Sequence, residues 1–216
     1  MLQRALRSPL AIGAIFLSVL FCASAPRDAA AQGQGAAGFI QNLGTRGLQA
    51  LSPSVPQAQR VASFRQLFQA DFDIPDISRF VLGQHARSMP PQEQQEFTGL
   101  FQEYIAHSYA VRLAPYAGAP FRVTGERPNG GETVVSSEVT KPGGGQPTRI
   151  DWHVMGNGGR YLVTDVVVDG VSMKTTQRSE FASIIQRNGG RPEALLAALR
   201  QQIAQSGSAG SSTPQR

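Results

Sequence analysis

The fold is decided by residues 121–173, which read FRVTGERPNGGETVVSSEVTKPGGGQPTRIDWHVMGNGGRYLVTDVVVDGVSM. Apolar residues alternate with polar ones in four segments, and the breaks between the segments are PNGG, PGGG and NGG. Alternation is typical of a strand with one buried face, and short turns rich in Asn and Gly join antiparallel neighbours. We therefore predict a four-stranded antiparallel meander with one face packed against helices and the other partly exposed to solvent. The inward face should carry Val135, Val139, Ile150, Trp152, Val154, Leu162 and Val166.

Helices are predicted upstream of the meander. Apolar residues recur at helical spacing from Phe39 to about Pro115, and the clearest amphipathic helix covers Gln94 to Leu113. A second stripe runs from Val61 to Phe72, and a short helix is expected from Asp76 to Leu82. The stripe of the long helix consists of Phe97, Leu100, Phe101, Tyr104, Ile105, Ser108, Val111 and Arg112.

Helical spacing also returns after the meander. It is visible at Phe181, Ile184 and Ile185, and residues 188–190 (Asn-Gly-Gly) are expected to end this helix with a left-handed C-cap. Pro192 then opens a last helix. The order helices, meander, helices predicts an α+β fold, with about six helices packed on one side of a curved sheet.

The N-terminus has the features of a secretory signal peptide. Arg4 and Arg7 precede an apolar run over residues 10–21 that ends in small residues. This run is shorter than the roughly 20 residues that cross a bilayer as a helix. We expect residues 1–31 to be removed by cleavage near Ala31. Cys22 suggests lipidation as an alternative, but Phe21 stands before it, where a lipidation signal requires a small residue.

Removal of the signal peptide changes what the chain can do. Cys22 is the only cysteine, so the mature protein would hold no disulfide, thiol nucleophile or Cys-ligated metal. The loss of three arginines and one aspartate lowers the formal net charge from +5 to +3. The remaining basic residues are scattered, which argues against nucleic-acid binding and leaves only weak attraction to an anionic membrane. We expect one domain over residues 32–205 and a disordered tail over residues 206–216.

Residues that could carry chemistry are few. His85, His107 and His153 are far apart and belong to no hydrolase or metal motif. Residues 71–76 contain three carboxylates, but the stretch lacks the Gly and the distant Glu of a calcium loop, and an N-cap accounts for it. Asp165 is expected to point outward. The residues therefore predict no metal, cofactor or catalytic group.

Aromatic residues converge on the predicted interior in large number. They include Phe64, Phe72, Phe80, Phe97, Phe101, Tyr104, Tyr109, Tyr116, Phe121, Trp152 and Phe181. An ordinary filled core would explain them, because periodicity does not distinguish a filled core from a hollow one. The residues alone leave both interpretations open.

Three strings resemble the MlaC family of periplasmic phospholipid-binding proteins, also called the toluene-tolerance auxiliary family. They are FDIPDISRFVLGQHARSMPPQEQQEFTGLFQEYIAHSYAVRL (72–113), RIDWHVMGNGG (149–159) and RYLVTDVVVDGVSMKTTQRSEFASIIQRNGG (160–190). Where the family commonly has a Trp after its Leu-Gly and an Asn-Tyr-Arg, this chain has His85-Ala86-Arg87 and Thr176-Gln177-Arg178. These departures are closer to the hopanoid-associated (HpnM-like) branch.

The resemblance implies a periplasmic lipid carrier rather than an enzyme. It implies a fold like nuclear transport factor 2 (NTF2-like) around an apolar cavity for a phospholipid or a hopanoid, without a cofactor. It also implies an inner-membrane ABC transporter complex as partner, an outer-membrane lipoprotein complex in the phospholipid branch, and transient membrane contact. The alternative is a small-molecule enzyme of the same fold, an isomerase or dehydratase, with His107 or Asp165 as base. The residues expected to bind the ligand are Phe72, Phe80, Phe97, Phe101, Tyr104, Ile105, Ser108, Tyr116, Phe121, Val135, Val139, Ile150, Trp152, Val154, Leu162, Val166 and Phe181.

Overall fold

The structure is a computed structural model that describes residues 35–157 and 159–209. The predicted signal peptide, its cleavage site and Cys22 lie outside the described residues, as do residues 210–216 of the predicted tail. Residues 206–209, which the sequence assigns to that tail, belong to the last helix.

The sheet is an antiparallel meander with the strand order β1-β2-β3-β4-β5. Its four long strands confirm the prediction, and β5 is an addition of two residues. Asp169 and Gly170 turn the chain back from β4 to β5, and their φ values of 47° and 85° fit a tight hairpin. The strands are β1 (Phe121–Asn129), β2 (Glu132–Val139), β3 (Thr148–Asn157), β4 (Arg160–Val168) and β5 (Val171–Ser172).

The register of the central strands follows the predicted alternation over most of their length. Trp152 of β3 stands opposite Val135 of β2 and Val166 of β4, so the three residues share the inward face. Ile150 lies two residues before Trp152 in β3 and pairs with Val168 of β4. The period of two therefore places these side chains correctly.

A β-bulge changes the register between β3 and β4. The pairing of β3 with β4 shifts between His153 and Val154, so that β4 carries one extra residue there. Beyond the bulge, Val163 is fully buried, whereas Leu162 pairs with the exposed Met155. The prediction that Leu162 lies on the inward face is wrong, because strict alternation does not anticipate a bulge.

Within the described residues, six α-helices precede and follow the meander in the chain, as predicted, and local signals explain where several of them begin. Asp73 caps α3, its carboxylate accepting a hydrogen bond from the Asp76 backbone N–H at 3.1 Å. Pro91 occupies the first turn of α4. Ser172 caps α5 through the Thr175 N–H at 3.2 Å. The helices are α1 (Ala36–Ala50), α2 (Gln57–Asp71), α3 (Ile74–Leu82), α4 (Pro91–Arg112), α5 (Met173–Arg187) and α6 (Glu193–Ala209).

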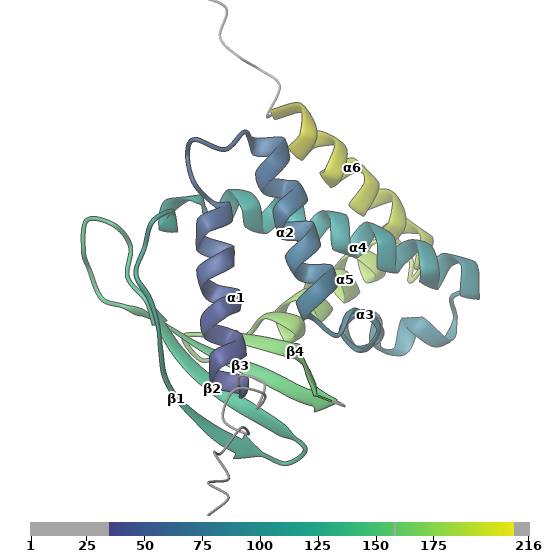
Figure 1. Ribbon diagram of the computed structural model, residues 1–216. Helices are drawn as coiled ribbons and strands as arrows, with labels where there is room; N and C mark the ends of the chain where they lie inside the picture. The colour runs from purple at the N-terminus through teal and green to yellow at the C-terminus, as the bar shows by residue number, and fades with distance from the viewer. Residues whose placement is uncertain (1–34, 158, 210–216) are drawn as a thin grey trace, which may run out of the picture. The chain divides into compact units, whose positions relative to one another are not determined.

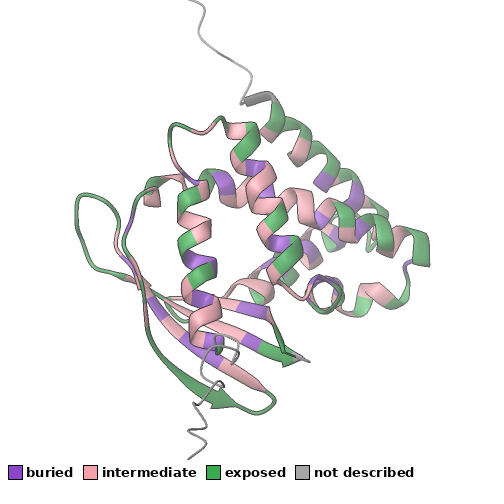
Figure 2. Ribbon diagram, viewed as in Figure 1, coloured by how far each residue is buried: buried purple, intermediate pink, exposed green. Residues whose placement is uncertain are grey.

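The helices gather on one side of the sheet (Figure 1). They bury apolar side chains in three clusters, the smallest of which joins Val61 of α2 to Ala106 and Ala110 of α4. The buried residues are spread through both layers, with the outer helix faces exposed (Figure 2). Among residues 35–157 and 159–209, no helix combines the length and apolar character needed to cross a bilayer. The helical core, between α3, α4, α5 and α6, centres on Phe97, Phe101, Phe181, Ile185, Leu195 and Leu199. The sheet core, between α1 and the strands, centres on Ala36, Ile40, Leu43, Val135, Val154 and Val163.

Candidate ligand-binding cavity

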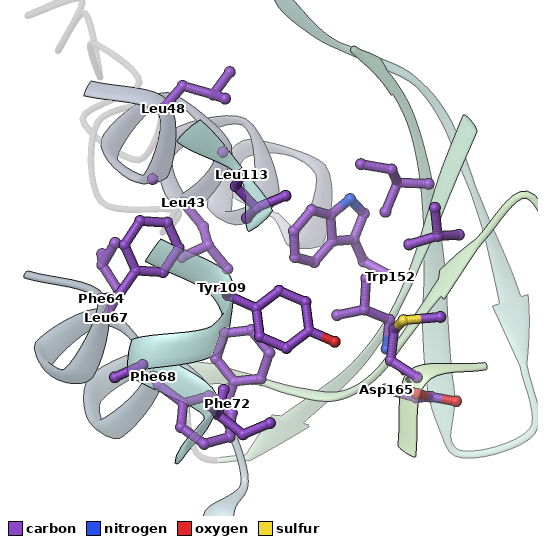
Figure 3. A pocket seen from close by; sticks show the side chains of 18 of the residues that line it. Leu43, Leu48, Phe64, Leu67, Phe68, Phe72, Tyr109, Leu113, Trp152 and Asp165 are labelled. Carbon is purple, nitrogen blue, oxygen red and sulfur yellow. Dashed lines mark hydrogen bonds between the residues drawn. The ribbon is translucent and has the colours of Figure 1, made fainter. Parts of the chain in front are cut away.

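A cavity of about 280 Å³ lies between the inward face of the sheet and helices α1, α2 and α4. Its surface is almost wholly apolar. Figure 3 shows how side chains from separate elements converge on it. The labelled ones are Leu43 and Leu48 from α1; Phe64, Leu67 and Phe68 from α2, with Phe72 directly after it; Tyr109 from α4, with Leu113 directly after it; Trp152 from β3; and Asp165 from β4.

Two glycines of α1 belong to this wall. The ring of Phe121 packs directly on Gly44, where an added Cβ would lie 2.3 Å from a ring carbon. Gly47, one turn later, also lines the cavity, and a Cβ added there would meet no heavy atom within 4 Å. Glycine lowers the stability of a helix interior by about 1 kcal/mol relative to alanine. The two glycines therefore keep α1 close to Phe121 and leave the adjoining volume open.

Trp152 supplies the apolar centre of the sheet wall. Its indole Nε1 donates a hydrogen bond to the buried Ser137 Oγ at 2.8 Å, within the sheet. Its ring meets that of Phe121 edge to face, with centroids 6.3 Å apart. Because the polar N–H has a partner in the sheet, the ring presents apolar surface to the cavity.

Tyr109 brings a hydroxyl group to the cavity from α4. Its side chain reaches across the cavity toward the strand that carries Asp165 (Figure 3). Burial raises the pKa of the Tyr109 hydroxyl above its usual value, and the carboxylates of Glu180 and Asp165 add to the increase. The group is therefore a neutral hydrogen-bond donor at physiological pH.

Nine of the predicted ligand-binding residues lie on the cavity wall. They come from α4, from each of the strands β1 to β4, and from the segments at Phe72 and Tyr116, so the fold brings together what the sequence keeps far apart. Their contact with a ligand stays a prediction. These residues are Phe72, Phe101, Ile105, Tyr116, Phe121, Val139, Ile150, Trp152 and Val166.

The other eight predicted residues lie away from the cavity wall. Phe97 and Phe181 are fully buried in the helical core, and Phe80 and Tyr104 pack on it. Ser108 is half-buried on α4 outside the cavity lining. The remaining three belong to the sheet: Val135 and Val154 are buried in the sheet core, and Leu162 lies on the opposite face.

Several lining residues escaped the sequence prediction. Those from α1 had no signal beyond a weak helical period, although a glycine pair three residues apart inside a helix is a recognisable feature. Tyr109 and Leu113 continue the stripe of the long helix, and Phe64, Leu67 and Phe68 belong to the second stripe. The unpredicted lining residues are Leu43, Gly44, Gly47, Leu48, Leu51, Phe64, Leu67, Phe68, Ile77, Ala106, Tyr109, Leu113, Thr148, Thr164, Asp165, Val168, Met173, Lys174 and Gln177.

Asp165 differs from its prediction, because it is only 7% exposed and does not point into solvent. Its carboxylate accepts hydrogen bonds from the Ser172 hydroxyl at 2.6 Å, the Val166 N–H at 2.8 Å and the Lys174 N–H at 3.1 Å. These bonds hold the start of α5 against β4. The carboxylate thus stabilises the fold at the edge of the cavity.

His107 does not join Asp165 in an acid–base pair. It lies on α4 outside the cavity lining, and its Nδ1 is buried without a hydrogen-bond partner in the described part of the chain. The same part of the chain contains no group of three or more His, Cys, Asp or Glu residues placed to hold a metal ion. The arrangement suits the enclosure of apolar groups better than proton transfer.

A polar cluster links three strands beside the cavity. His153 Nδ1 lies 3.1 Å from Glu132 Oε2, and the Thr164 hydroxyl donates to Glu132 Oε1 at 2.5 Å. Partial burial acts to raise the pKa of the Glu132 carboxyl, but the hydrogen bonds from Thr164 and His153 outweigh it, and the pKa lies below its usual value. Glu132 and His153 are outside the cavity lining, so the cluster stabilises the sheet.

Comparison with known proteins places this architecture in a family. A family model described as MlaC protein matches residues 46–201, which include the helical core, all strands of the sheet and almost the whole cavity wall. The chain belongs to the MlaC family. This membership confirms the family resemblance read from the sequence.

Two individual proteins illustrate the relationship. Toluene tolerance protein ttg2D of Pseudomonas putida is 21% identical to this chain over 145 residues, which are 67% of each protein. A phospholipid-binding protein from Ralstonia solanacearum, solved in complex with a phospholipid, matches with a TM-score of 0.67 and 20% identity. That match covers 80% of this chain and 98% of the Ralstonia chain. It shows that this MlaC protein shares the α+β fold of the Ralstonia protein.

Proposed function

We propose that this MlaC protein is a periplasmic lipid carrier, which encloses the tail of a phospholipid or a hopanoid and shuttles it between the outer and inner membranes. It works with an inner-membrane ABC transporter complex and, in the phospholipid case, with an outer-membrane lipoprotein complex. The observation that carries the proposal is the apolar cavity between the sheet and α1, α2 and α4. The signal peptide predicted from residues 1–31 supports the location.

The physical need for such a carrier is large. Moving one CH₂ group from lipid to water costs about 0.8 kcal/mol, so a 16-carbon tail costs on the order of 12 kcal/mol. A wall of aromatic and branched side chains offers the tail an equivalent apolar surface. The cavity of about 280 Å³ is close to the lower end of the range of ligand pockets, roughly 300–1,000 Å³. This size favours partial enclosure, with the polar head outside.

A glycine on α1 allows the cavity to be filled without displacing the native side chains. Gly47→Trp would introduce an indole where a Cβ meets no neighbour. Gly99→Trp is the matched control, because Gly99 is an exposed helical glycine on α4 that also has no neighbour within 4 Å. Both changes replace glycine by a better helix former. Only the first enters the cavity.

The test is uptake of fluorescent lipid from vesicles by the two variants, with the melting temperature measured in parallel. We expect Gly47→Trp to keep the wild-type melting temperature and to lose lipid uptake, whereas Gly99→Trp keeps both. Normal uptake by a folded Gly47→Trp variant would show that lipid does not occupy this cavity.

A further inference from the structure

Two basic side chains of α5 lie beside one aromatic ring of α3. Lys174 Nζ lies 4.9 Å from the centre of the Phe80 ring, and Arg178 Cζ lies 5.1 Å from the same centre. Lys174 also lines the cavity. Like charges repel, so a ring flanked by two cations is a place where an anion would be stabilised.

Neither cation is neutralised by the described residues. Lys174 and Arg178 form no salt bridge there, and their side chains donate no hydrogen bond. The nearby acids have other partners. Asp165 accepts from Ser172 and from backbone N–H groups, and Glu180 accepts from the Gln177 amide at 3.1 Å. Glu132, whose carboxylate is influenced by the charge of Lys174, is paired with Thr164 and His153. The guanidinium and ammonium donors therefore remain free for a ligand.

The turn after α3 is shaped around the guanidinium of Arg178. Gly83 ends α3 with a φ of 56°, a conformation that favours glycine. A Cβ at this position would lie 2.9 Å from Arg178 Nε and 3.1 Å from Cζ. The absence of a side chain thus leaves room for the guanidinium between Gly83 and the Phe80 ring. Arginine held in this way is suited to a phosphate, whose oxygens accept two parallel N–H bonds.

We propose that Lys174 and Arg178 bind the phosphate of a lipid whose tail occupies the cavity. The inference rests on the proposed carrier function and makes it more specific, because it selects a phosphate-bearing lipid over a neutral polycyclic one. It also orients the ligand, with the head at α5 and the tail directed toward α1.

The test compares two probes that differ only in phosphate: phosphatidic acid and diacylglycerol with identical acyl chains. Delipidated protein is titrated with each probe and, in a third arm, with inorganic phosphate. The variants are Lys174→Gln/Arg178→Gln, the charge-preserving Arg178→Lys, and the control Lys141→Gln. Lys141 is a matched control because its ammonium lies 5.2 Å from the centre of the Tyr116 ring, beside another part of the cavity wall.

We expect the double variant to bind phosphatidic acid about tenfold more weakly, as two partly exposed charge contacts imply, and to bind diacylglycerol as wild type does. Arg178→Lys and Lys141→Gln should retain the preference for phosphatidic acid. An unchanged affinity for phosphatidic acid, or an equal loss for both probes, would overturn the inference. Tight binding of inorganic phosphate alone would assign the site to free phosphate instead. If wild type binds neither lipid, the carrier function itself fails.

Discussion

Truncation of Phe181 tests whether the helical core contributes to stability independently of the ligand cavity. The ring is 1% exposed, and its centroid lies 5.8 Å from that of Phe97, 6.0 Å from that of Phe101 and 5.9 Å from that of Tyr104. Phe181→Ala should reduce the free energy of unfolding by about 3–5 kcal/mol, the usual loss for a fully buried phenylalanine. In a domain of this size, each kcal/mol lowers the melting temperature by about 2–4 °C. We therefore expect a fall of about 6–20 °C.

The assay measures thermal unfolding and lipid uptake on the same preparation, with uptake recorded well below the new melting temperature. Phe181→Ala should take up lipid as wild type does, because Phe181 is not part of the cavity wall. Phe121→Ala is the comparison: Phe121 is half-buried and lines the cavity, so it should cost about 1–2 kcal/mol and weaken uptake. If Phe181→Ala melts within 2 °C of wild type but binds no lipid, the separation of core and cavity is refuted.

Three further changes test other parts of the account. Ile105→Trp and Val166→Trp each place a ring in the cavity and should block lipid uptake. The loss in free energy of unfolding should be smaller than the 1–3 kcal/mol typical of an overpacked core. Normal lipid uptake by both variants would show that lipid does not bind along this wall. Asp165→Ala should destabilise the domain by about 2 kcal/mol in urea unfolding, since partly buried donors at the start of α5 lose their acceptor. An unchanged midpoint would contradict that role. Because the Glu132 pKa is lowered in the fold, its stabilising effect is present above the unfolded value of 4.5 and lost as pH falls below it. In Glu132→Gln, the free energy of unfolding should therefore fall less steeply as the pH is lowered through the acid range. An unchanged dependence on pH would show that Glu132 does not contribute to it.

The sheet was largely predictable because each strand follows a period of two. Trp152, Ile150 and Val166 lie on the inward face as alternation requires. Leu162 does not, because the bulge at His153 and Val154 depends on how two strands meet, and a single strand carries no signal for it.

The cavity was predictable only in part, because a stripe identifies the face of a helix but not the space in front of it. Phe97 and Ile105 belong to one stripe of α4, yet Phe97 is enclosed by the helical core and Ile105 faces the cavity. The difference arises from the partners: α6 packs on α4, whereas Gly47 of α1 leaves open space beside the cavity. The position of α1 is set by tertiary packing.

The most direct test of the carrier function is to purify the natively exported protein without added lipid, extract it with organic solvent and identify the extract by mass spectrometry. We predict that lipid is recovered in a reproducible ratio to protein and that the Gly47→Trp variant, purified in parallel, yields little or none. Protein that is repeatedly empty, and that takes up no lipid from vesicles afterwards, would contradict the central claim.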